Sequence, residues 1–381
     1  NRVRRQRQMC IRDSLCTEIT LNTSQDEIAV CNLGSINLPN HLDKSGNLDE
    51  KKVEKTITTA IRMLDNVIDI NYYAVPQAEN SNFKHRPIGL GIMGFQDALY
   101  IKKIPYASEH AVTFADESME MVSYYAIKSS SDLAAERGAY SSYKGSLWSK
   151  GILPLDSVEL LKKERGEEFI EVDTTTRLDW EGLKKIVKKQ GMRNSNVMAI
   201  APTATIANIT GLTQSIEPTY SNLFVKSNLS GEFTIINMHL VDALKEIGMW
   251  DEVMVYDLKN LNGSLEGINR VPEELKKLFA TSFEVEPKWL IEAASRRQKW
   301  IDQSQSLNLY VSEPNGKKLD VMYKMAWLRG LKTTYYLRSR SATTSEKSTI
   351  TNLELNAVAA NQGSEAPEAC SILDPDCEAC Q

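Results

Sequence analysis

Long apolar segments are missing from this sequence of 381 residues, and so is any excess of positive charge. No apolar run approaches the roughly 20 residues that a membrane-spanning helix needs. The formal net charge is -5, whereas proteins that bind nucleic-acid polymers or anionic membranes carry a positive field. The basic beginning lacks the apolar core and the small-residue cleavage site of a secretory signal. These absences predict a cytoplasmic enzyme with no membrane and no nucleic-acid polymer as partner.

Cysteine is absent from residues 32–369, which is most of the chain. A disulfide framework of the kind found in secreted proteins would distribute its cysteines through the core. Cysteines confined to the two ends indicate thiol chemistry in a reducing compartment instead. The six cysteines are Cys10, Cys16, Cys31, Cys370, Cys377 and Cys380.

What is present is the composition and periodicity of a globular α/β protein. Apolar residues make up 42% of the chain and charged residues 25%, which is ordinary for a soluble domain. Apolar residues at helical spacing predict a helix over 49–71, with Asp49 as N-cap, and another over 108–137 that stops at Gly138. Alternating helices and strands after it predict an α/β architecture with largely parallel strands. The further helices are expected over 180–190, 287–303 and 319–330, and the strands at the start of 196–211 and over 306–311 and 332–338.

Three glycines, Gly89, Gly91 and Gly94, fall within the segment "RPIGLGIMGFQDAL". We interpret them as a close-packing turn that enters a helix. A dinucleotide-binding loop is the alternative. It requires a strand before the glycines and an acidic residue at a set distance after them, and the sequence offers neither.

Residues 341–381 differ from the rest of the chain in being polar and almost free of aromatic residues, which predicts a mobile tail. The tail ends in a Cys377-x-x-Cys380 pair. Zinc would need a second pair of ligands, and only Cys370 lies nearby, so a dithiol that exchanges with another disulfide is expected. Counted from Arg340, a flexible coil ending at Cys377 would reach roughly 30–35 Å. This reach would allow the dithiol to enter the body of its own subunit or of a neighbouring copy.

Near the other end, Cys16 and Glu18 stand two residues apart in an extended segment, "SLCTEITL". Residues at this spacing in an extended segment lie on the same face, so a thiol and a carboxylate are expected side by side. Cys31, at the end of the apolar run in "AVCNLGSINL", is the expected internal target of the tail dithiol.

Two further segments carry hydroxyl groups that are open to more than one interpretation. Thr203 and Thr205 lie in a loop that enters a helix, where free backbone N–H groups could cradle a phosphate. A plain helix cap is the more common use of such threonines. Tyr335 and Tyr336 are adjacent in a predicted strand, where neighbours face opposite sides. Their residue pattern by itself favours aromatic core packing for at least one ring.

Taken together, these segments resemble the large (alpha) subunit of a class I ribonucleotide reductase. The resemblance rests on ordered motifs from Leu15 to Gln381: "LCTEI", "AVCNLGSINL", "RPIGLGIMGFQDAL", "GMRNSNVMAIAPTATIA" with "QSIEP", "LKTTYYLR" and the terminal C-x-x-C. It implies a ten-stranded α/β barrel, represented here by the finger loop and the second half-barrel over 15–340. Residues 341–381 would be the flexible redox tail.

The resemblance also implies a reaction, the reduction of ribonucleoside diphosphates to 2′-deoxyribonucleoside diphosphates for DNA precursor synthesis. Cys16 would, as a thiyl radical, take the hydrogen from C3′, and Glu18 would accept the proton of the 3′-hydroxyl. Cys31 would supply one of the two reducing thiols. The tail pair, Cys377 and Cys380, would reduce the resulting disulfide and be recharged by thioredoxin or glutaredoxin.

The remaining implied roles concern the substrate and the radical. Tyr335 and Tyr336 would relay the radical from the small (beta) subunit, whose metal centre generates it. No cofactor and no metal would be held by this chain. The intact alpha subunit would be a homodimer whose ATP and deoxynucleotide effectors bind regions missing here. The substrate diphosphate would be held by Thr203, Ala204, Thr205 and Ile206.

The sequence departs from the family pattern at its beginning. Ser14 stands where the family has an asparagine that contacts substrate, with one hydroxyl in place of an amide. The partner cysteine of Cys31 and the upstream half of the barrel are not found. Because "VRRQRQMCIRDS" resembles a translated sequencing adapter, we hypothesise that residues 1–14 are not native and that native sequence resumes at Leu15. A continuous reading frame across this junction in several independent clones would refute the hypothesis.

Three alternatives compete with this interpretation. The glycyl-radical class needs a radical glycine in the C-terminal tail, which is not found, and the cobalamin class does not need the tyrosine pair. A catalytically inactive fragment, which retains only small-subunit or thioredoxin binding, is the alternative from a different class. A half-barrel would expose strand edges, so no turnover is expected from this chain assayed alone with its small subunit, and measurable dCDP would contradict this.

Overall fold

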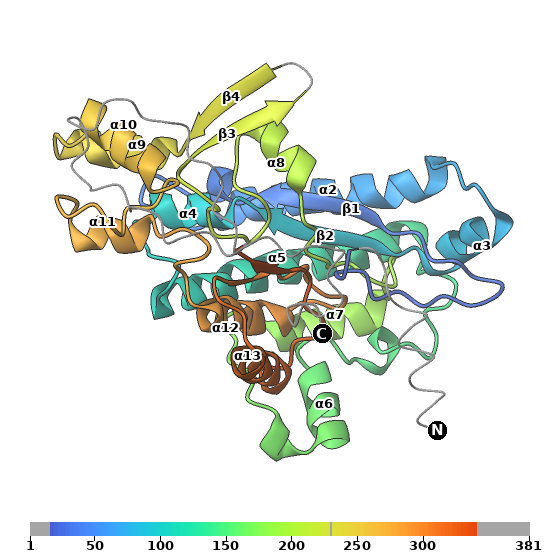
Figure 1. Ribbon diagram of the computed structural model, residues 1–381. Coiled ribbons are helices and arrows are strands. Elements are labelled where there is room, and N and C mark those ends of the chain that lie inside the picture. Colours follow the sequence, from blue (N-terminus) through green and yellow to red (C-terminus); the bar gives the residue numbers. More distant parts are fainter. Residues whose placement is uncertain (1–15, 229–230, 341–381) are drawn as a thin grey trace, which may run out of the picture.

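A computed structural model describes residues 16–228 and 231–340 of the chain (Figure 1). The strands are β1 (Asn32–Asn37), β2 (Ile88–Met93), β3 (Leu223–Asn228), β4 (Gly231–Ile236), β5 (Leu309–Val311) and β6 (Leu337–Ser339). The helices are α2 (Glu50–Ile70), α3 (Pro76–His85), α4 (Phe95–Ile101), α5 (Glu109–Arg137), α6 (Ser157–Arg165), α7 (Trp180–Gln190), α8 (Ala204–Thr210), α9 (Met238–Glu246), α10 (Glu252–Asn260), α11 (Glu273–Leu278), α12 (Pro287–Gln298) and α13 (Gly316–Leu328). Short 3-10 turns are η1 (Pro39–His41), η2 (Trp148–Lys150) and η3 (Glu167–Phe169).

A series of parallel backbone pairings forms the inner layer. β1 pairs with β2 in parallel, from Asn32 opposite Ile88 to Asn37 opposite Met93. Isolated parallel bridges continue the layer from Leu90 to Met198 and from Ile200 to Gln305. The last pairing is that of β5 with β6, also parallel. The prediction of an α/β fold with largely parallel strands is therefore confirmed, and the architecture is that of a partial barrel.

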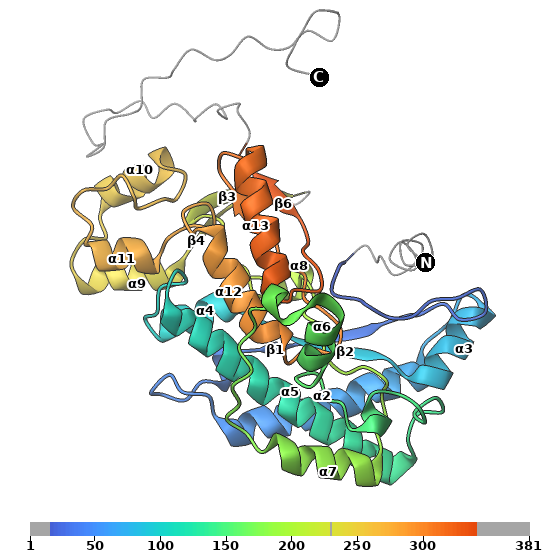
Figure 2. The same ribbon diagram turned by 90° about the horizontal axis from the view of Figure 1, so that it is seen from below.

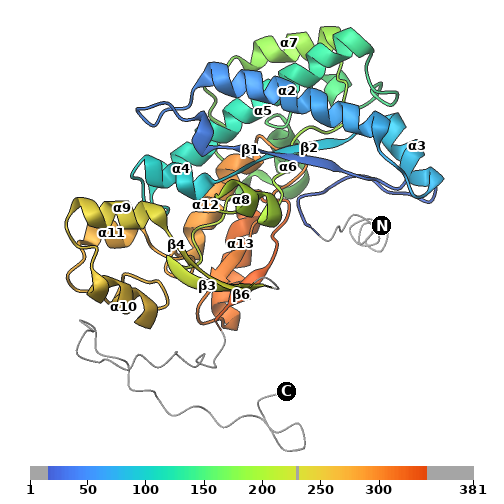
Figure 3. The same cartoon turned by 90° about the horizontal axis from the view of Figure 1, so that it is seen from above.

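Helices cover the outer side of this layer, where α2, α5 and α7 lie close together (Figure 3). The apolar positions of α2 recur at helical spacing, and Ile57, Ile61 and Ile68 are fully buried. Asp49 caps α2 by accepting a hydrogen bond from Lys52 N at 3.1 Å, as predicted. The predicted helices over 108–137 and 180–190 are found as α5 and α7 within one residue at the N-terminus. No helix in the described ranges is long and apolar enough to cross a membrane.

The glycine-rich segment is a strand, and our prediction of a turn there was wrong. Residues 88–93 form β2, which is buried along its whole length. A Cβ atom on Gly91 would lie 2.5 Å from the carbonyl oxygen of Ala199, so glycine is needed because the neighbouring backbone approaches closely. The predicted helix entry is correct, since α4 begins at Phe95 after Gly94, which has a left-handed φ of 73°. The glycines are therefore needed for close packing, as predicted, but they lie in a strand and not in a turn.

A smaller lobe stands beside the helical layer and contains the β3–β4 hairpin with α9, α10 and α11 (Figures 1 and 2). β3 and β4 pair antiparallel. The lobe has its own apolar cluster, which includes Leu240, Leu244, Met254, Leu258 and Phe279. Tyr100 of α4 belongs to this cluster and stacks near Phe279 with ring centroids 4.9 Å apart. The lobe is thus attached to the barrel layer through α4.

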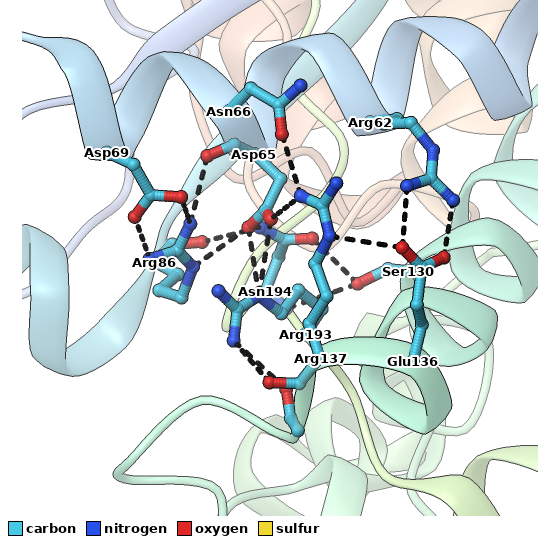
Figure 4. Close-up of polar contacts among 11 residues, drawn as sticks. Arg62, Asp65, Asn66, Asp69, Arg86, Ser130, Glu136, Arg137, Arg193 and Asn194 are labelled. Atoms are coloured by element: carbon cyan, nitrogen blue, oxygen red, sulfur yellow. Dashed lines mark hydrogen bonds and ion pairs between the residues drawn. The ribbon is translucent and has the colours of Figure 1, made fainter.

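A buried carboxylate, Asp65 of α2, ties the helical layer to the beginning of the inner strands (Figure 4). Its side chain accepts hydrogen bonds from Arg86 Nε at 2.8 Å, from Arg137 Nη1 at 3.1 Å and from Asn194 Nδ2 at 3.2 Å. Arg193 Nε lies 3.2 Å from the second carboxylate oxygen. Arg86 precedes β2 and Asn194 precedes the segment 196–200, so one charge holds two strand beginnings against one helix.

The expectations for residues 1–14 and for the tail over 341–381 lie outside the described residues. They remain predictions, as does the boundary between barrel and tail at residue 340.

Candidate active site

Glu18 is buried against the segment 303–306, which lies between α12 and β5. Its carbonyl oxygen accepts a hydrogen bond from Ser304 N at 3.0 Å, and its Oε2 accepts one from the hydroxyl of Ser306. Burial raises the pKa of Glu18, although the hydrogen bond from Ser306 opposes this rise. Its other oxygen, Oε1, is buried and finds no hydrogen-bond partner among the described residues. A buried acceptor without a donor is costly, by about 1–3 kcal/mol, so this oxygen is suited to a hydroxyl donor from a ligand.

Cys16 lies beside the tyrosine pair. Tyr335 and Tyr336 have ring centroids 3.9 Å apart at an interplanar angle of 35°. The pKa of Tyr335 is raised, first by its hydrogen bond with Tyr336, then by burial and by the thiol of Cys16, with which it also shares a hydrogen bond. The three side chains therefore form a continuous series of contacts from Tyr336 to Cys16.

The sequence pattern predicts a strand at these tyrosines with at least one ring buried, and this prediction was wrong. β6 begins only at Leu337, so neither tyrosine is constrained to the alternation of a strand. Tyr336 is 49% exposed and Tyr335 is partly exposed. Because the backbone is irregular there, the two rings contact each other in a tilted arrangement.

Cys31 lies just before β1, with its sulfur enclosed although the residue as a whole is partly exposed. The amide Nε2 of Gln303 is 3.8 Å from its sulfur. Burial raises the pKa of Cys31 to about 12, and the charges of Glu18 and Asp302 contribute to the rise. Gln303 also accepts a hydrogen bond from Thr20 N at 3.4 Å, so its side chain connects the Cys16–Glu18 segment with Cys31.

The threonine loop begins the short helix α8. Thr203 is its N-cap residue and adopts a left-handed conformation, with φ of 52°. Its hydroxyl does not cap the helix but accepts a hydrogen bond from Ser215 N at 2.7 Å. The next residues, Ala204, Thr205 and Ile206, are exposed. Backbone N–H groups at the beginning of α8 and the Thr205 hydroxyl thus face solvent, whereas the Thr203 hydroxyl is already engaged.

Two contacts of this site were not predicted from the sequence. Ser306 holds the Glu18 carboxylate from 288 residues away, and Gln303 holds Cys31 from 272 residues away. Both lie in the segment "QSQS", whose polar residues carry no motif. Ser14, Cys377 and Cys380 lie outside the described residues. Within 16–228 and 231–340, no three His, Cys, Asp or Glu side chains come together in a group that could hold a metal ion.

Comparison with known proteins identifies the family. The family model for the ribonucleotide reductase barrel domain matches residues 1–337. The ribonucleoside-diphosphate reductase subunit alpha of Chlamydia trachomatis is 58% identical over 381 residues, which cover 97% of this chain and 36% of that protein. The same subunit of Chlamydia muridarum is 60% identical over 337 residues, covering 88% of this chain and 32% of that protein.

A more distant relative gives the same result. The ribonucleoside-diphosphate reductase large subunit of Danio rerio is 42% identical over 329 residues, covering 86% of this chain and 40% of that protein. The chain thus spans between 32% and 40% of the length of these three relatives. Because the family model matches most of the chain, the chain belongs to the ribonucleotide reductase family and carries sequence of its barrel domain.

Proposed function

We propose that this chain supplies the radical-bearing part of a ribonucleoside-diphosphate reductase active site. The observation that carries the proposal is the series of contacts from Tyr336 through Tyr335 to Cys16. Stacked phenols that end at a thiol are suited to passing an electron and a proton stepwise, because each group is within hydrogen-bonding distance of the next. Core packing, the other role considered for the tyrosines, does not require the half-exposed position of Tyr336.

In this proposal Cys16 becomes a thiyl radical and removes the hydrogen atom from C3′ of the ribose. Glu18 accepts the proton of the 3′-hydroxyl through Oε1, the oxygen that has no donor among the described residues. Ser306 holds the opposite oxygen and so orients the carboxylate. Loss of water from C2′ then follows, and two thiols reduce the sugar.

Cys31 is one of the two reducing thiols in this proposal. A pKa near 12 keeps it protonated at neutral pH, so it carries the hydrogen that the reduction consumes. Its partner cysteine is expected upstream of the finger loop. Cys377 and Cys380 then reduce the disulfide by exchange, and thioredoxin or glutaredoxin recharges them.

The substrate diphosphate is proposed to bind at the beginning of α8. Backbone N–H groups there, at Thr205 and Ile206, together with the Thr205 hydroxyl, provide donors for phosphate oxygens. The Thr203 hydroxyl contributes indirectly, because its hydrogen bond with Ser215 N fixes the loop. Ser14 would contact the substrate from the finger loop.

The partners follow from the same reaction. The radical is generated at the metal centre of a separate small subunit, which docks near Tyr336, and the large subunit forms a homodimer. This chain itself holds no cofactor in the proposal. Its relatives are named as reductase subunits, which supports the assignment of partner and substrate class.

The test is reduction of CDP by the longer subunit that contains these residues, assembled with its small subunit. Replacement of Cys16 by alanine or serine is expected to remove product formation, while nucleotide binding and small-subunit binding persist. Turnover by either variant would contradict the proposal. Small-subunit binding by this chain alone, without turnover, while the longer subunit reduces CDP, would favour the second candidate, an inactive fragment that retains only binding.

A further inference from the structure

A third tyrosine, Tyr310, lies in β5, which pairs with the strand that follows the tyrosine pair. In the parallel pairing of β5 with β6, Leu309 lies opposite Leu337 and Tyr310 opposite Arg338. Tyr336 directly precedes this register, and its N–H donates to Asn308 Oδ1 at 3.1 Å. The carbonyl oxygen of Tyr336 accepts a hydrogen bond from Leu309 N at 2.9 Å. The backbone of Tyr336 is therefore hydrogen-bonded to Leu309 and Asn308, one and two positions before Tyr310.

Tyr310 differs from Tyr335 and Tyr336 in being buried and in having a carboxylate as partner. It is 5% exposed, and its hydroxyl donates to Glu217 Oε2 at 2.6 Å. Glu217 comes from the loop after α8, in "QSIEP", and hydrogen bonds with Asn308 as well. The guanidinium of Arg338 lies 5.4 Å from the Tyr336 ring centroid, and its positive charge lowers the pKa of Glu217. One cluster therefore joins Tyr310, its carboxylate and the ring of Tyr336.

The environment of Glu217 makes it a good proton acceptor. Burial raises the pKa of Glu217 to about 7, and hydrogen bonds from Tyr310 and Asn308 limit the rise. A carboxylate whose pKa is this high binds a proton more strongly than an ordinary surface carboxylate, yet is still partly ionised at neutral pH. A phenol is oxidised most readily when a base stands ready to take its proton.

We propose that Tyr310 is a third redox-active tyrosine, a side branch of the radical relay at Tyr336, with Glu217 as its proton acceptor. The inference rests on the function proposed above and deepens it. Tyr310 takes the oxidising equivalent from Tyr336 when the step from Tyr335 to Cys16 cannot proceed. Because Tyr310 is buried and Tyr336 is 49% exposed, the radical is shielded from solutes while it waits.

The transfer step is balanced as follows. The Tyr336 phenoxyl radical takes one electron from Tyr310 and one proton from the solvent that contacts its exposed ring, and becomes a phenol. The O–H bond of Tyr310 breaks, its proton moves to Glu217 Oε2, and a carboxylic acid O–H bond forms. Tyr310 is left as a phenoxyl radical. Reversal of the same step returns the oxidising equivalent to Tyr336 and the relay.

The chain offers a matched control in Tyr106. This tyrosine is also buried, at 2% exposure, but its hydroxyl donates to the carbonyl oxygen of Ile216 at 2.9 Å. A carbonyl oxygen does not accept a proton at neutral pH. Tyr106 therefore has the burial of Tyr310, and Glu217 acts on it through charge, but its hydroxyl donates no hydrogen bond to that carboxylate.

The experiment places a ring-fluorinated tyrosine at position 310, or at 106 as control, in the longer subunit that contains this sequence. The subunit also carries Cys16→Ser, which blocks the step after Tyr335, and is assembled with its radical-bearing small subunit, effector and substrate, then frozen for electron paramagnetic resonance. A radical with fluorine hyperfine splitting is expected for the label at 310 and not at 106. The proposal would be overturned if the small-subunit radical decreased but neither label gave fluorine splitting. It would also be overturned if the labels at 310 and 106 both gave splitting.

Two further measurements separate this inference from the proposed function. The intensity of the fluorine-split signal from the label at 310 should fall at least severalfold in the Glu217→Gln variant. Glutamine keeps a hydrogen-bond acceptor but takes up no proton. An unchanged signal would overturn the role of Glu217. Oxidation of the labelled subunit by a photochemically generated soluble oxidant bypasses the small subunit. A small-subunit radical that never decreases would show that the proposed relay fails. Fluorine splitting from the label at 310 under photo-oxidation would then still decide whether Tyr310, with Glu217 as proton acceptor, can be oxidised.

Discussion

The Glu18 carboxylate is held by the hydroxyl of Ser306, although 288 residues separate them along the chain. The contact occurs because the segment of Glu18 runs beside residues 303–306, with Ser304 N bonded to the Glu18 carbonyl. It leaves Oε1 as the carboxylate oxygen without a donor among the described residues. Ser306 therefore decides which oxygen of Glu18 is engaged, and its hydrogen bond lowers the pKa of the carboxyl group that burial raises.

Ser306→Ala should move the pH profile of turnover upward. The Ser306 hydrogen bond lowers the pKa of Glu18, which burial raises, so its loss raises that pKa further. In the reaction proposed above Glu18 is a base, a role it can fill only when ionised, so the acid side of the profile should shift to higher pH. The measurement is kcat as a function of pH in the assembled reductase. Ser304→Ala is the control, because the Ser304 hydroxyl contacts Thr333 and Gln298 instead. Equal shifts in both variants would contradict the role of Ser306.

Cys31 should alkylate slowly in the folded protein. Its pKa is raised to about 12 from 9.0, so at pH 8 its thiolate fraction should be about 1000-fold below that of an ordinary cysteine. The rate with iodoacetamide should increase as pH rises toward 12. Peptide mass spectrometry can follow this single residue over time. The same cysteine in urea-unfolded chain serves as the reference, and equal rates in the two states would show that burial does not protect the thiol.

Tyr335→Phe should abolish nucleotide reduction without changing the fold. The substitution removes only the hydroxyl that connects Tyr336 with Cys16. The expected result is loss of product to the background of the assay, with unchanged binding of nucleotide and small subunit. Tyr323→Phe, on the exposed side of α13, is the matched control and should retain full activity. Retained turnover in the Tyr335 variant would refute the relay.

Gly91→Ala should destabilise the barrel layer and weaken nucleotide binding. The new Cβ would lie 2.5 Å from Ala199 O and 2.9 Å from Ile200 Cα, so the segment that leads to the Thr203 loop must shift. We expect a loss of about 1–3 kcal/mol in the free energy of unfolding, measured in urea, together with a higher KM. Gly34→Ala in β1 is the control, since its Cβ would meet Leu64 at an ordinary 3.4 Å. Equal effects in both variants would refute the explanation.

Asp65→Ala should be among the most destabilising single changes in the helical layer. It removes a fully buried carboxylate and leaves the Arg86, Arg137 and Arg193 guanidinium groups without their shared partner. Loss of one side of a buried ion pair costs about 3–5 kcal/mol, which urea unfolding can measure. Glu136→Ala breaks the exposed pair with Arg62 and should change stability little. A small effect at Asp65 would show that the arginines find other partners.

Local signals account for the parts of the fold that were predicted well. Helices α2 and α5 were expected within a residue of their observed ends, because Asp49, Ser108 and Gly138 are caps that act on adjacent backbone. The strand at β2 and the irregular backbone at Tyr335 were missed. Both depend on partners far along the chain, since β2 pairs with β1 and contacts Ala199, and Tyr335 N bonds to Leu307 O.

The sequence by itself identified the family through ordered motifs, and the resemblance nominated Cys16, Glu18, Cys31 and the tyrosine pair as candidate site residues. Only the tertiary structure decided how these groups act on each other. It placed Tyr335 against Cys16, left one oxygen of Glu18 with no donor from residues 16–228 and 231–340, and buried Tyr310 against Glu217. The physical reason is that proton affinity depends on burial and on hydrogen bonds. Here these involve segments hundreds of residues apart, which no local sequence pattern connects.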